Sequence, residues 1–159
     1  MVRIAVDAMG GDHAPGTVVD GVLGAAELFD DLELILVGHQ DAIAKQFQEK
    51  GKDPSAFEII HAAEVIGMDE APVVALRRKR DSSIRVMVSL LKAGRCDAVF
   101  SAGNTGAVVA ASTMLLGLLP GVLRAGIAVT LPIRETPVVL IDVGANVQCK
   151  PQHLFQYGL

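Results

Sequence analysis

Three short polar loops that contain glycine each follow a short apolar run, and together they hold the residues best suited to bind an anion. The loops are residues 7–13, 101–106 and 142–146, after the apolar runs 2–6, 98–100 and 138–141. Apolar runs of this length are typical of buried strands, and the first two loops lead into helical patterns. Loops that end strands meet at the carboxyl edge of an open α/β sheet, where such folds bind ligands. We therefore expect one anion site lined by backbone N–H groups.

The second of these loops contains the clearest signal for the start of a helix. Gly103 permits a turn with positive φ, and Asn104 or Thr105 can cap the helix that follows. The N–H groups of the first helical turn would then attract phosphate, or hold the oxyanion of a tetrahedral intermediate. We expect Ser101 and Gly106 to complete this phosphate-binding loop. Helix capping alone is the alternative interpretation.

The first loop adds two permissive backbone positions and two polar side chains. Gly10 and Gly11 allow the chain to turn closely around an anion, and the Asp12 carboxylate can cap the next helix. The imidazole of His13 titrates near neutral pH, which makes it a candidate hydrogen-bond donor or general acid. The alternative for His13 is that it only satisfies local backbone groups.

Asp7 and Asp142 each end a predicted strand, so both are expected at the same edge of the sheet. There they can orient His13, a cation or Asn146. We favour this role over proton transfer, and paired carboxylates would repel phosphate unless they were neutralised. Gly144 belongs to the third loop and is expected to join the phosphate site. The site requires that all three loops converge on one anion.

Several common catalytic patterns are absent from the sequence. It contains no dinucleotide-binding glycine turn, no lysine-bearing P-loop, no zinc-protease helix and no nucleophilic-serine elbow. Covalent catalysis therefore lacks a candidate nucleophile. Cys96 and Cys149 lie far apart without CxxC spacing, which favours a reduced, cytoplasmic chain. We expect no metal site and no cofactor.

The composition is that of one compact globular domain, residues 1–159. Of these residues, 51% are hydrophobic and 20% are charged. The formal net charge of -4 does not favour binding to nucleic acid. Residues 77–85 nevertheless carry five cations against Asp81 alone. This basic segment suits a small anion or an acidic protein partner, with a solvated helix end as the alternative. The most apolar stretch, 107–119, is shorter than the roughly 20 residues that span a bilayer.

Strand and helix patterns alternate along the chain, which predicts an α/β fold. Strands are expected at 3–6, 34–37, 57–60, 98–100, 126–131 and 138–141, and helices near 15–26, 41–48, 72–79, 82–93, from 105 and from 151. The last two strands are predicted to pair as an antiparallel hairpin, which would make the sheet mixed. Asp81 is a candidate cap for the helix that follows it.

Three glycines, Gly16, Gly21 and Gly24, weaken the first predicted helix, since each interior glycine costs about 1 kcal/mol relative to alanine. We expect that these glycines allow the helix to approach the sheet closely. Neutral sequence drift is the alternative explanation. The helix start at 151–157 stops after two further residues and leaves apolar side chains exposed. We interpret the chain as the N-terminal part of a longer enzyme.

Four motifs in this order resemble the bacterial phosphate acyltransferases of phospholipid synthesis, the PlsX family. They are residues 7–15 (DAMGGDHAP), 75–83 (ALRRKRDSS), 101–107 (SAGNTGA) and 142–147 (DVGANV) with 149–151 (CKP). Together they cover essentially the whole chain. The resemblance implies a three-layer α/β/α sandwich with a mostly parallel sheet, related to phosphotransacetylases and isopropylmalate-type dehydrogenases. Family members have a comparable second half that this chain does not contain.

The resemblance also implies an activity and partners. The family transfers a fatty acyl group from acyl carrier protein to inorganic phosphate and so supplies acyl phosphate to a membrane-bound glycerol phosphate acyltransferase. Members of the family are homodimers that associate peripherally with the inner face of the cell membrane.

We combine the resemblance with the loop chemistry in one hypothesis. The Asn104 loop and the Gly10–Gly11 turn bind phosphate and the thioester oxygen. His13 donates a proton or a hydrogen bond either to the phosphate or to that oxygen. Asp142 and Asn146 fix the orientation of these groups. The basic residues of the second motif, Arg77, Arg78 and Lys79, bind the acidic carrier protein. A noncatalytic phosphate-binding or dimerisation fragment and a dehydrogenase of the related fold remain as alternatives.

Overall fold

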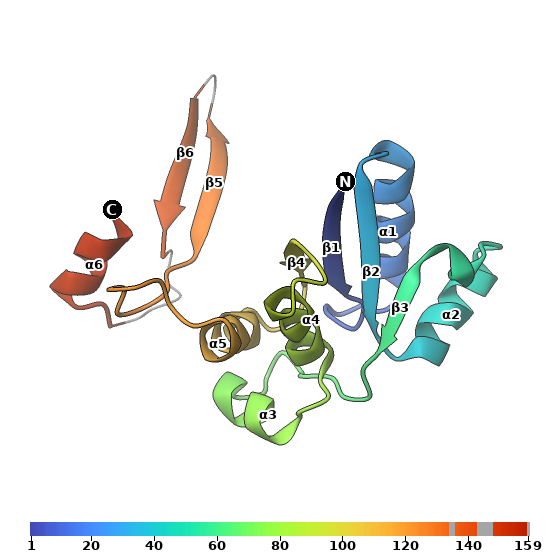
Figure 1. Ribbon diagram of the computed structural model, residues 1–159, viewed down its shortest axis with the longest axis horizontal. Coiled ribbons are helices and arrows are strands. Elements are labelled where there is room, and N and C mark those ends of the chain that lie inside the picture. The colour runs from blue at the N-terminus through green and yellow to red at the C-terminus, as the bar shows by residue number, and fades with distance from the viewer. Residues whose placement is uncertain (134–135, 143–147, 159) are drawn as a thin grey trace. The chain divides into compact units, whose positions relative to one another are not determined.

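The computed structural model describes residues 1–133, 136–142 and 148–158 (Figure 1). The chain divides into two compact units, Met1–Leu116 and Gly117–Leu159. The first unit contains two of the three loops discussed above, and the second contains the start of the third. That the whole chain forms one domain stays a prediction.

A parallel four-stranded sheet forms the centre of the first unit. Its strands are β1 (Val2–Asp7), β2 (Leu32–Gly38), β3 (Glu58–His61) and β4 (Ala98–Phe100), in the order β3-β2-β1-β4. The four expected strands are confirmed, with shifts of one or two residues at their ends. Val6 of β1 pairs with Leu36 on one side and with Phe100 on the other. The loops that follow β1 and β4 are therefore neighbours in space.

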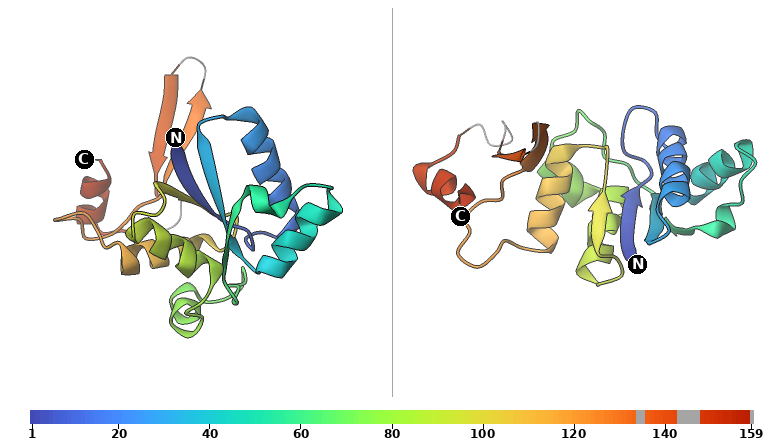
Figure 2. Two further views of the ribbon diagram at one scale, coloured as in Figure 1. Left: turned by 45° about the vertical axis from the view of Figure 1, so that its right-hand side comes forward. Right: turned by 90° about the horizontal axis from the view of Figure 1, so that it is seen from above.

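Helices cover both faces of this sheet, as the turned view in Figure 2 shows. One face carries α1 (Gly16–Leu28) and α2 (Gln40–Glu49), followed by a 3-10 turn, Pro54–Ala56. On the other face α4 (Ser83–Lys92) packs on the strands, α5 (Thr105–Leu115) packs against α4, and α3 (Pro72–Arg78) packs against α5. The architecture is the expected α/β/α sandwich.

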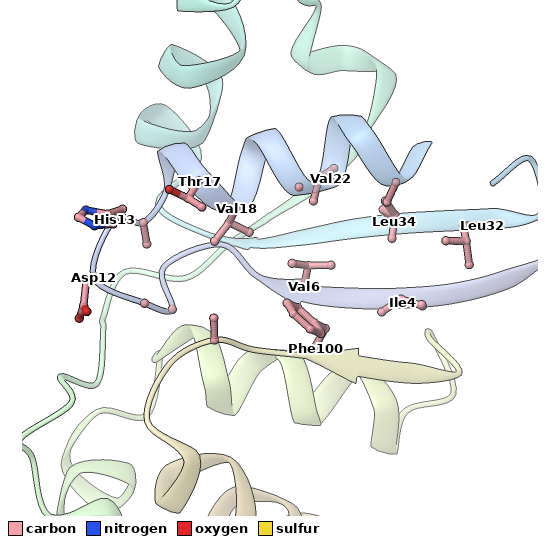
Figure 3. A pocket seen from close by; sticks show the side chains of 16 residues that line it. Ile4, Val6, Asp12, His13, Thr17, Val18, Val22, Leu32, Leu34 and Phe100 are labelled. Atoms are coloured by element: carbon pink, nitrogen blue, oxygen red, sulfur yellow. The ribbon is translucent and has the colours of Figure 1, made fainter. Parts of the chain in front are cut away.

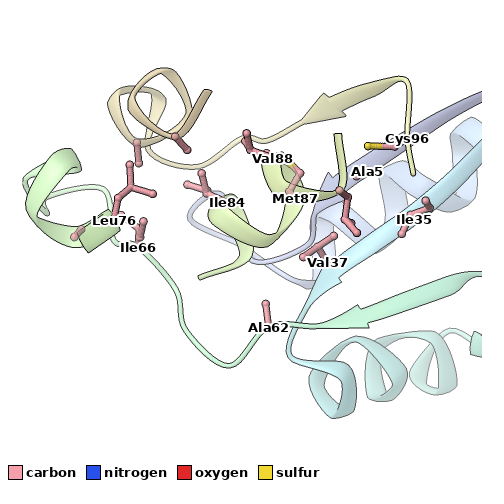
Figure 4. Close-up of a cluster of buried hydrophobic side chains, with 14 residues drawn as sticks. Ala5, Ile35, Val37, Ala62, Ile66, Leu76, Ile84, Met87, Val88 and Cys96 are labelled. Carbon is pink, nitrogen blue, oxygen red and sulfur yellow. The ribbon is translucent and has the colours of Figure 1, made fainter. Parts of the chain in front are cut away.

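Strand alternation assigns the apolar side chains to two separate cores. On β1, Val6 faces the core with α1 and α2, whereas Ala5 faces the core with α4. Figure 4 shows the second core, where Ile84, Met87 and Val88 of α4 pack over the sheet. These buried residues form the apolar face of the helix.

The structure corrects the interpretation of the glycines in α1. A Cβ on Gly21 or on Gly24 would meet no atom within 4 Å, so neither glycine is required by close approach to the sheet. A Cβ on Gly16 would lie 3.1 Å from Oε1 of Gln46, which belongs to α2 rather than to a strand. The helix packs on the sheet through Val19 and Val22 instead.

Two predicted helix caps are also wrong. The N-cap of α4 is Ser82, without a side-chain capping bond. The Asp81 carboxylate instead accepts from the backbone N–H of Ala63 at 2.8 Å, so it joins the segment after β3 to the start of α4. The N-cap of α1 is Pro15, again without a side-chain cap, so Asp12 does not cap this helix.

The second unit contains a hairpin and a short helix. Strands β5 (Ala128–Ile133) and β6 (Thr136–Ile141) pair antiparallel, as expected, and α6 (Pro151–Tyr157) follows. Among the described residues the two strands pair only with each other, so the four-stranded sheet is parallel throughout rather than mixed. No helix in the described part of the chain is long and apolar enough to cross a membrane.

Candidate anion site at the carboxyl edge of the sheet

The loops after β1 and β4 touch through their glycines. A Cβ on Gly10 would lie 2.7 Å from the backbone N of Gly103 and 2.8 Å from Oδ2 of Asp7. A Cβ on Gly103 would lie 3.2 Å from Cα of Gly10. Real side chains do not tolerate contacts as short as those at Gly10. Gly10 therefore needs to be glycine so that the two backbones can approach each other, and a side chain at Gly103 would be tight. The positive φ expected at Gly103 is wrong, because this glycine serves the close approach of the loops rather than a left-handed turn.

A buried carboxylate holds these two loops together. Asp7 is only 1% exposed, and its Oδ2 accepts from the Ser101 hydroxyl at 2.7 Å. Its Oδ1 accepts from the backbone N–H of Met9 at 3.1 Å. The Ser101 oxygen in turn accepts from the N–H of Gly103 at 3.0 Å. Because the Asp7–Ser101 bond joins the two loops and the other two bonds each hold one loop to it, the geometry gives Asp7 and Ser101 a positioning role.

Asn104 caps α5, so Asn104 rather than Thr105 is the residue that caps this helix. Its Oδ1 accepts from the N–H of Ala107 at 3.0 Å, and the residue is 6% exposed. Its Nδ2 donates to the carbonyls of Gly67, Met68 and Glu70 at 3.0, 3.4 and 3.2 Å. Both ends of the amide are thus engaged within the protein. These bonds favour a positioning role for Asn104, whereas its expected contact with substrate stays a prediction.

The rest of the first loop opens toward solvent. Gly11 has φ of 100°, a conformation that side chains rarely adopt, so glycine is required at this turn. Asp12 and His13 follow with exposed side chains (Figure 3). The imidazole of His13 is therefore accessible to a ligand at the end of β1.

The start of α5 is the other open side of the site. Thr105 and Gly106 are exposed in the first turn of this 11-residue helix, whose unpaired N–H groups favour an anion. A Cβ on Gly106 would lie 2.7 Å from Cγ of Pro72, so this glycine also permits α3 to pack against α5.

The third loop belongs to the second unit. Asp142 directly follows β6 and has φ of 61°, and the Cys149 thiol donates to its Oδ2 at 3.2 Å. This hydrogen bond to the carboxylate raises the pKa of the Cys149 thiol. Gly144 and Asn146 lie outside the described residues. The convergence of this loop with the other two stays a prediction.

The basic segment separates into exposed and engaged side chains. Arg77 and Arg78 are exposed at the end of α3. The Lys79 ammonium instead donates to the carbonyl of Val65 at 2.6 Å and to the Glu70 carboxylate. The bond from Lys79, together with one from the Gly67 N–H, holds the pKa of Glu70 below its usual value. Of the three residues expected to bind the carrier protein, Arg77 and Arg78 are therefore the exposed ones.

A protein-family model described as "Fatty acid synthesis protein" matches residues 2–159. The chain belongs to this family. The "Phosphate acyltransferase" of Oleidesulfovibrio alaskensis is 50% identical over 156 residues, which are 98% of this chain and 45% of the relative. The "Phosphate acyltransferase" of Desulfitobacterium hafniense is 51% identical over 159 residues, or 100% of this chain and 47% of the relative. The resemblance to the phosphate acyltransferase family is thereby confirmed, and the chain spans about half the length of these relatives.

Solved structures confirm the expected fold. A phosphotransacetylase from Streptococcus pyogenes superposes with a TM-score of 0.68 at 21% identity, over 99% of this chain and 51% of that one. The EutD phosphotransacetylase from Staphylococcus aureus gives 0.62 at 20% identity, over 98% and 50%. The chain thus has the fold that its motifs imply.

Sequence reasoning missed two features of this candidate site. The first is the segment Gly67–Glu70, whose carbonyls bind Asn104 from 34 to 37 residues away. The second is an apolar groove of about 590 Å³ that runs from the first loop along α1 and β4. A sequence feature that could have indicated the groove is Phe100, an aromatic residue directly before Ser101. No cluster of metal-ligating side chains occurs among the residues that the structure describes.

Proposed function

We propose that the protein transfers a fatty acyl group from acyl carrier protein to inorganic phosphate, with the phosphate bound between the Gly10–Gly11 turn and the start of α5. The observation that carries the proposal is the close packing of Gly10 against Gly103 over the Asp7–Ser101 hydrogen bond. It places two groups of backbone donors at one edge of the sheet, beside an accessible histidine. The names of the relatives support the same reaction.

The proposed reaction depends on positioning the phosphate more than on deprotonating it. A phosphate oxygen attacks the carbonyl carbon of the thioester, a C–O bond forms, and the C–S bond breaks as the carrier thiolate leaves. The products are acyl phosphate and, after protonation, the carrier thiol. Phosphate dianion is already nucleophilic, so the donors of the two loops contribute by orienting it and by holding the carbonyl oxygen as charge develops there. In this proposal His13 donates the proton that the leaving thiolate takes up.

The partners follow from the same proposal. Arg77 and Arg78 provide an exposed positive patch for the acidic carrier protein. The protein works as a homodimer at the inner face of the cytoplasmic membrane and passes acyl phosphate to a membrane-bound glycerol phosphate acyltransferase. The name of the matched family supports this place in lipid metabolism.

The test is phosphate-dependent release of the carrier thiol from acyl carrier protein by the full product of the gene. We expect His13→Gln to lower kcat by about 100-fold or more, the usual contribution of a positioned acid. His39→Gln is the matched control, because His39 begins α2 rather than belonging to either glycine loop. An unchanged rate for His13→Gln would remove the proton-donor role.

The same assay separates the alternatives. Phosphate binding without thiol release supports a noncatalytic module. A dehydrogenase of the related fold requires nucleotide binding, so a measured affinity for NAD together with hydride transfer would replace the acyltransferase proposal.

A further inference from the structure

The apolar groove beside the candidate site is lined by residues of β1, β2, β4 and α1. Its floor is β1, through Ile4 and Val6, and one wall is the side of α1 that carries Val18 and Gly21 (Figure 3). The opposite wall is Phe100 of β4. The volume of about 590 Å³ lies in the range of about 300–1,000 Å³ that small-molecule sites occupy.

Small residues on α1 keep this groove open. Gly21 and Ala25 line it at helical spacing, and a Cβ on Gly21 would meet nothing within 4 Å. Across the groove Phe100 is 59% exposed, although Val6, its partner in the strand pairing, is only 5% exposed. Because this phenyl ring is largely exposed beside a buried strand residue, an apolar ligand that covered it would remove apolar surface from water.

The two ends of the groove differ in polarity. At one end lie Gly10, Gly11, Asp12 and His13, the open part of the candidate anion site. At the other end lie apolar residues of β2, Leu32 and Leu34. Because α1 runs back along the sheet from the first loop, the distance along it from Thr17 to Ala25 is about 12 Å at about 1.5 Å per residue. The shape fits a linear apolar ligand with one polar or anionic head.

We propose that this groove binds the hydrocarbon chain of the acyl group, with the carbonyl end at the first loop and the tail between α1 and Phe100. The identity of the ligand rests on the proposed acyltransferase function, and its position rests on the continuity of the groove with the glycine turn. Gly21 and Ala25 then act as specificity-determining residues, because their missing side chains leave the space that a long tail fills.

The test compares two identical substitutions on one helix. Gly21→Leu fills the groove, whereas Gly24→Leu adds the same side chain at a glycine that does not line it. Both variants are made in the full product of the gene, and binding of palmitate and hexanoate is measured by calorimetry, which needs no turnover. Each buried methylene strengthens binding by about fourfold. We expect Gly21→Leu to weaken palmitate binding by about tenfold or more, with little effect on hexanoate and no effect in Gly24→Leu.

Two results would overturn the proposal. One is palmitate affinity that is equal in the unsubstituted protein and in both variants. The other is a lower melting temperature for Gly21→Leu alone with unchanged palmitate affinity, which shows that another segment of the protein packs in the groove. Failure of the proposed function looks different: palmitate binding still depends on Gly21, but no phosphate-dependent release of carrier thiol occurs.

Discussion

At the scale of single residues, Asp7 shows how a buried charge can organise a loop junction. Its two carboxylate oxygens accept from a hydroxyl 94 residues away and from a backbone N–H two residues away. A buried carboxylate is stable only when such donors compensate for lost hydration. The same bonds fix the path of the chain at Gly10 and Ser101, so the residue determines where the backbone donors point.

Gly10→Ala tests this junction. The new Cβ would overlap the backbone N of Gly103 and the Asp7 carboxylate, and overpacking of this kind costs roughly 1–3 kcal/mol of unfolding free energy. We also expect loss of acyl transfer, because the two loops must move apart. The measurements are urea unfolding and the thiol-release assay.

Gly24→Ala is the control for the same substitution. It lies in α1 with no atom within 4 Å of the new Cβ, so it should raise stability by roughly 0.5–1 kcal/mol through helix propensity. Equal effects of the two changes would contradict the packing argument.

At the scale of elements, the Gly67–Glu70 segment links α3 to α5. Asn104 at the start of α5 binds three carbonyls of this segment, and Lys79 after α3 binds its Glu70 carboxylate. A polar segment therefore sets the position of the helix start that we assign to phosphate binding. The strength of this link depends on the charge of Glu70.

The link should weaken in acid. Since the pKa of Glu70 is lower in the folded protein than in the unfolded chain, its ion pair stabilises the fold above the unfolded value of about 4.3. That contribution is lost as pH falls through the lower folded pKa. We expect the stability difference between the unsubstituted protein and Glu70→Gln to be constant from about pH 7 to about pH 5 and to shrink below about pH 4.

Unfolding in urea across this pH range measures the difference directly. Glutamine keeps an acceptor for the Gly67 N–H, so the comparison isolates the charge. Asp53 and Asp97, whose carboxyl pKa values are also lowered, are present in both proteins and cancel. A difference that stays constant down to pH 3 would assign no role to the ionised carboxylate.

At the scale of the whole molecule, the chain is acidic, but its segment 77–85 carries five cations against Asp81 alone. The net charge is -4, and Arg77 and Arg78 extend from the end of α3. An acidic partner would be repelled by most of the surface and attracted by this patch, so the charge distribution favours one orientation of approach.

Reversal of this patch should weaken the encounter with the carrier protein. We expect the double substitution Arg77→Glu and Arg78→Glu to raise KM for acyl carrier protein several-fold at low salt, with kcat nearly unchanged. The effect should fade at high salt, since the screening length falls from about 10 Å at 0.1 M to about 3 Å at 1 M. Lys45→Glu on α2 is the matched control for a distant charge reversal. An unchanged KM for the double variant would reject this docking surface.

The sequence by itself determined the elements and the chemistry of their ends. Apolar runs predicted all four strands of the parallel sheet. The residue types alone predicted a turn at Gly11 and a helix cap at Asn104. These features depend on residues close together in the chain, so local patterns suffice to predict them. The family motifs added the fold and the family membership.

Only the tertiary structure decided which of these residues are free to act. The contact of Gly10 with Gly103, the bond of Asp7 to Ser101 and the engagement of Lys79 by Glu70 join segments that local patterns cannot relate. The same holds for Gly21, which was expected to face a strand and instead opens on a groove. The physical reason is that free space and hydrogen-bond satisfaction are properties of neighbours in three dimensions, and a sequence specifies those neighbours only through the fold.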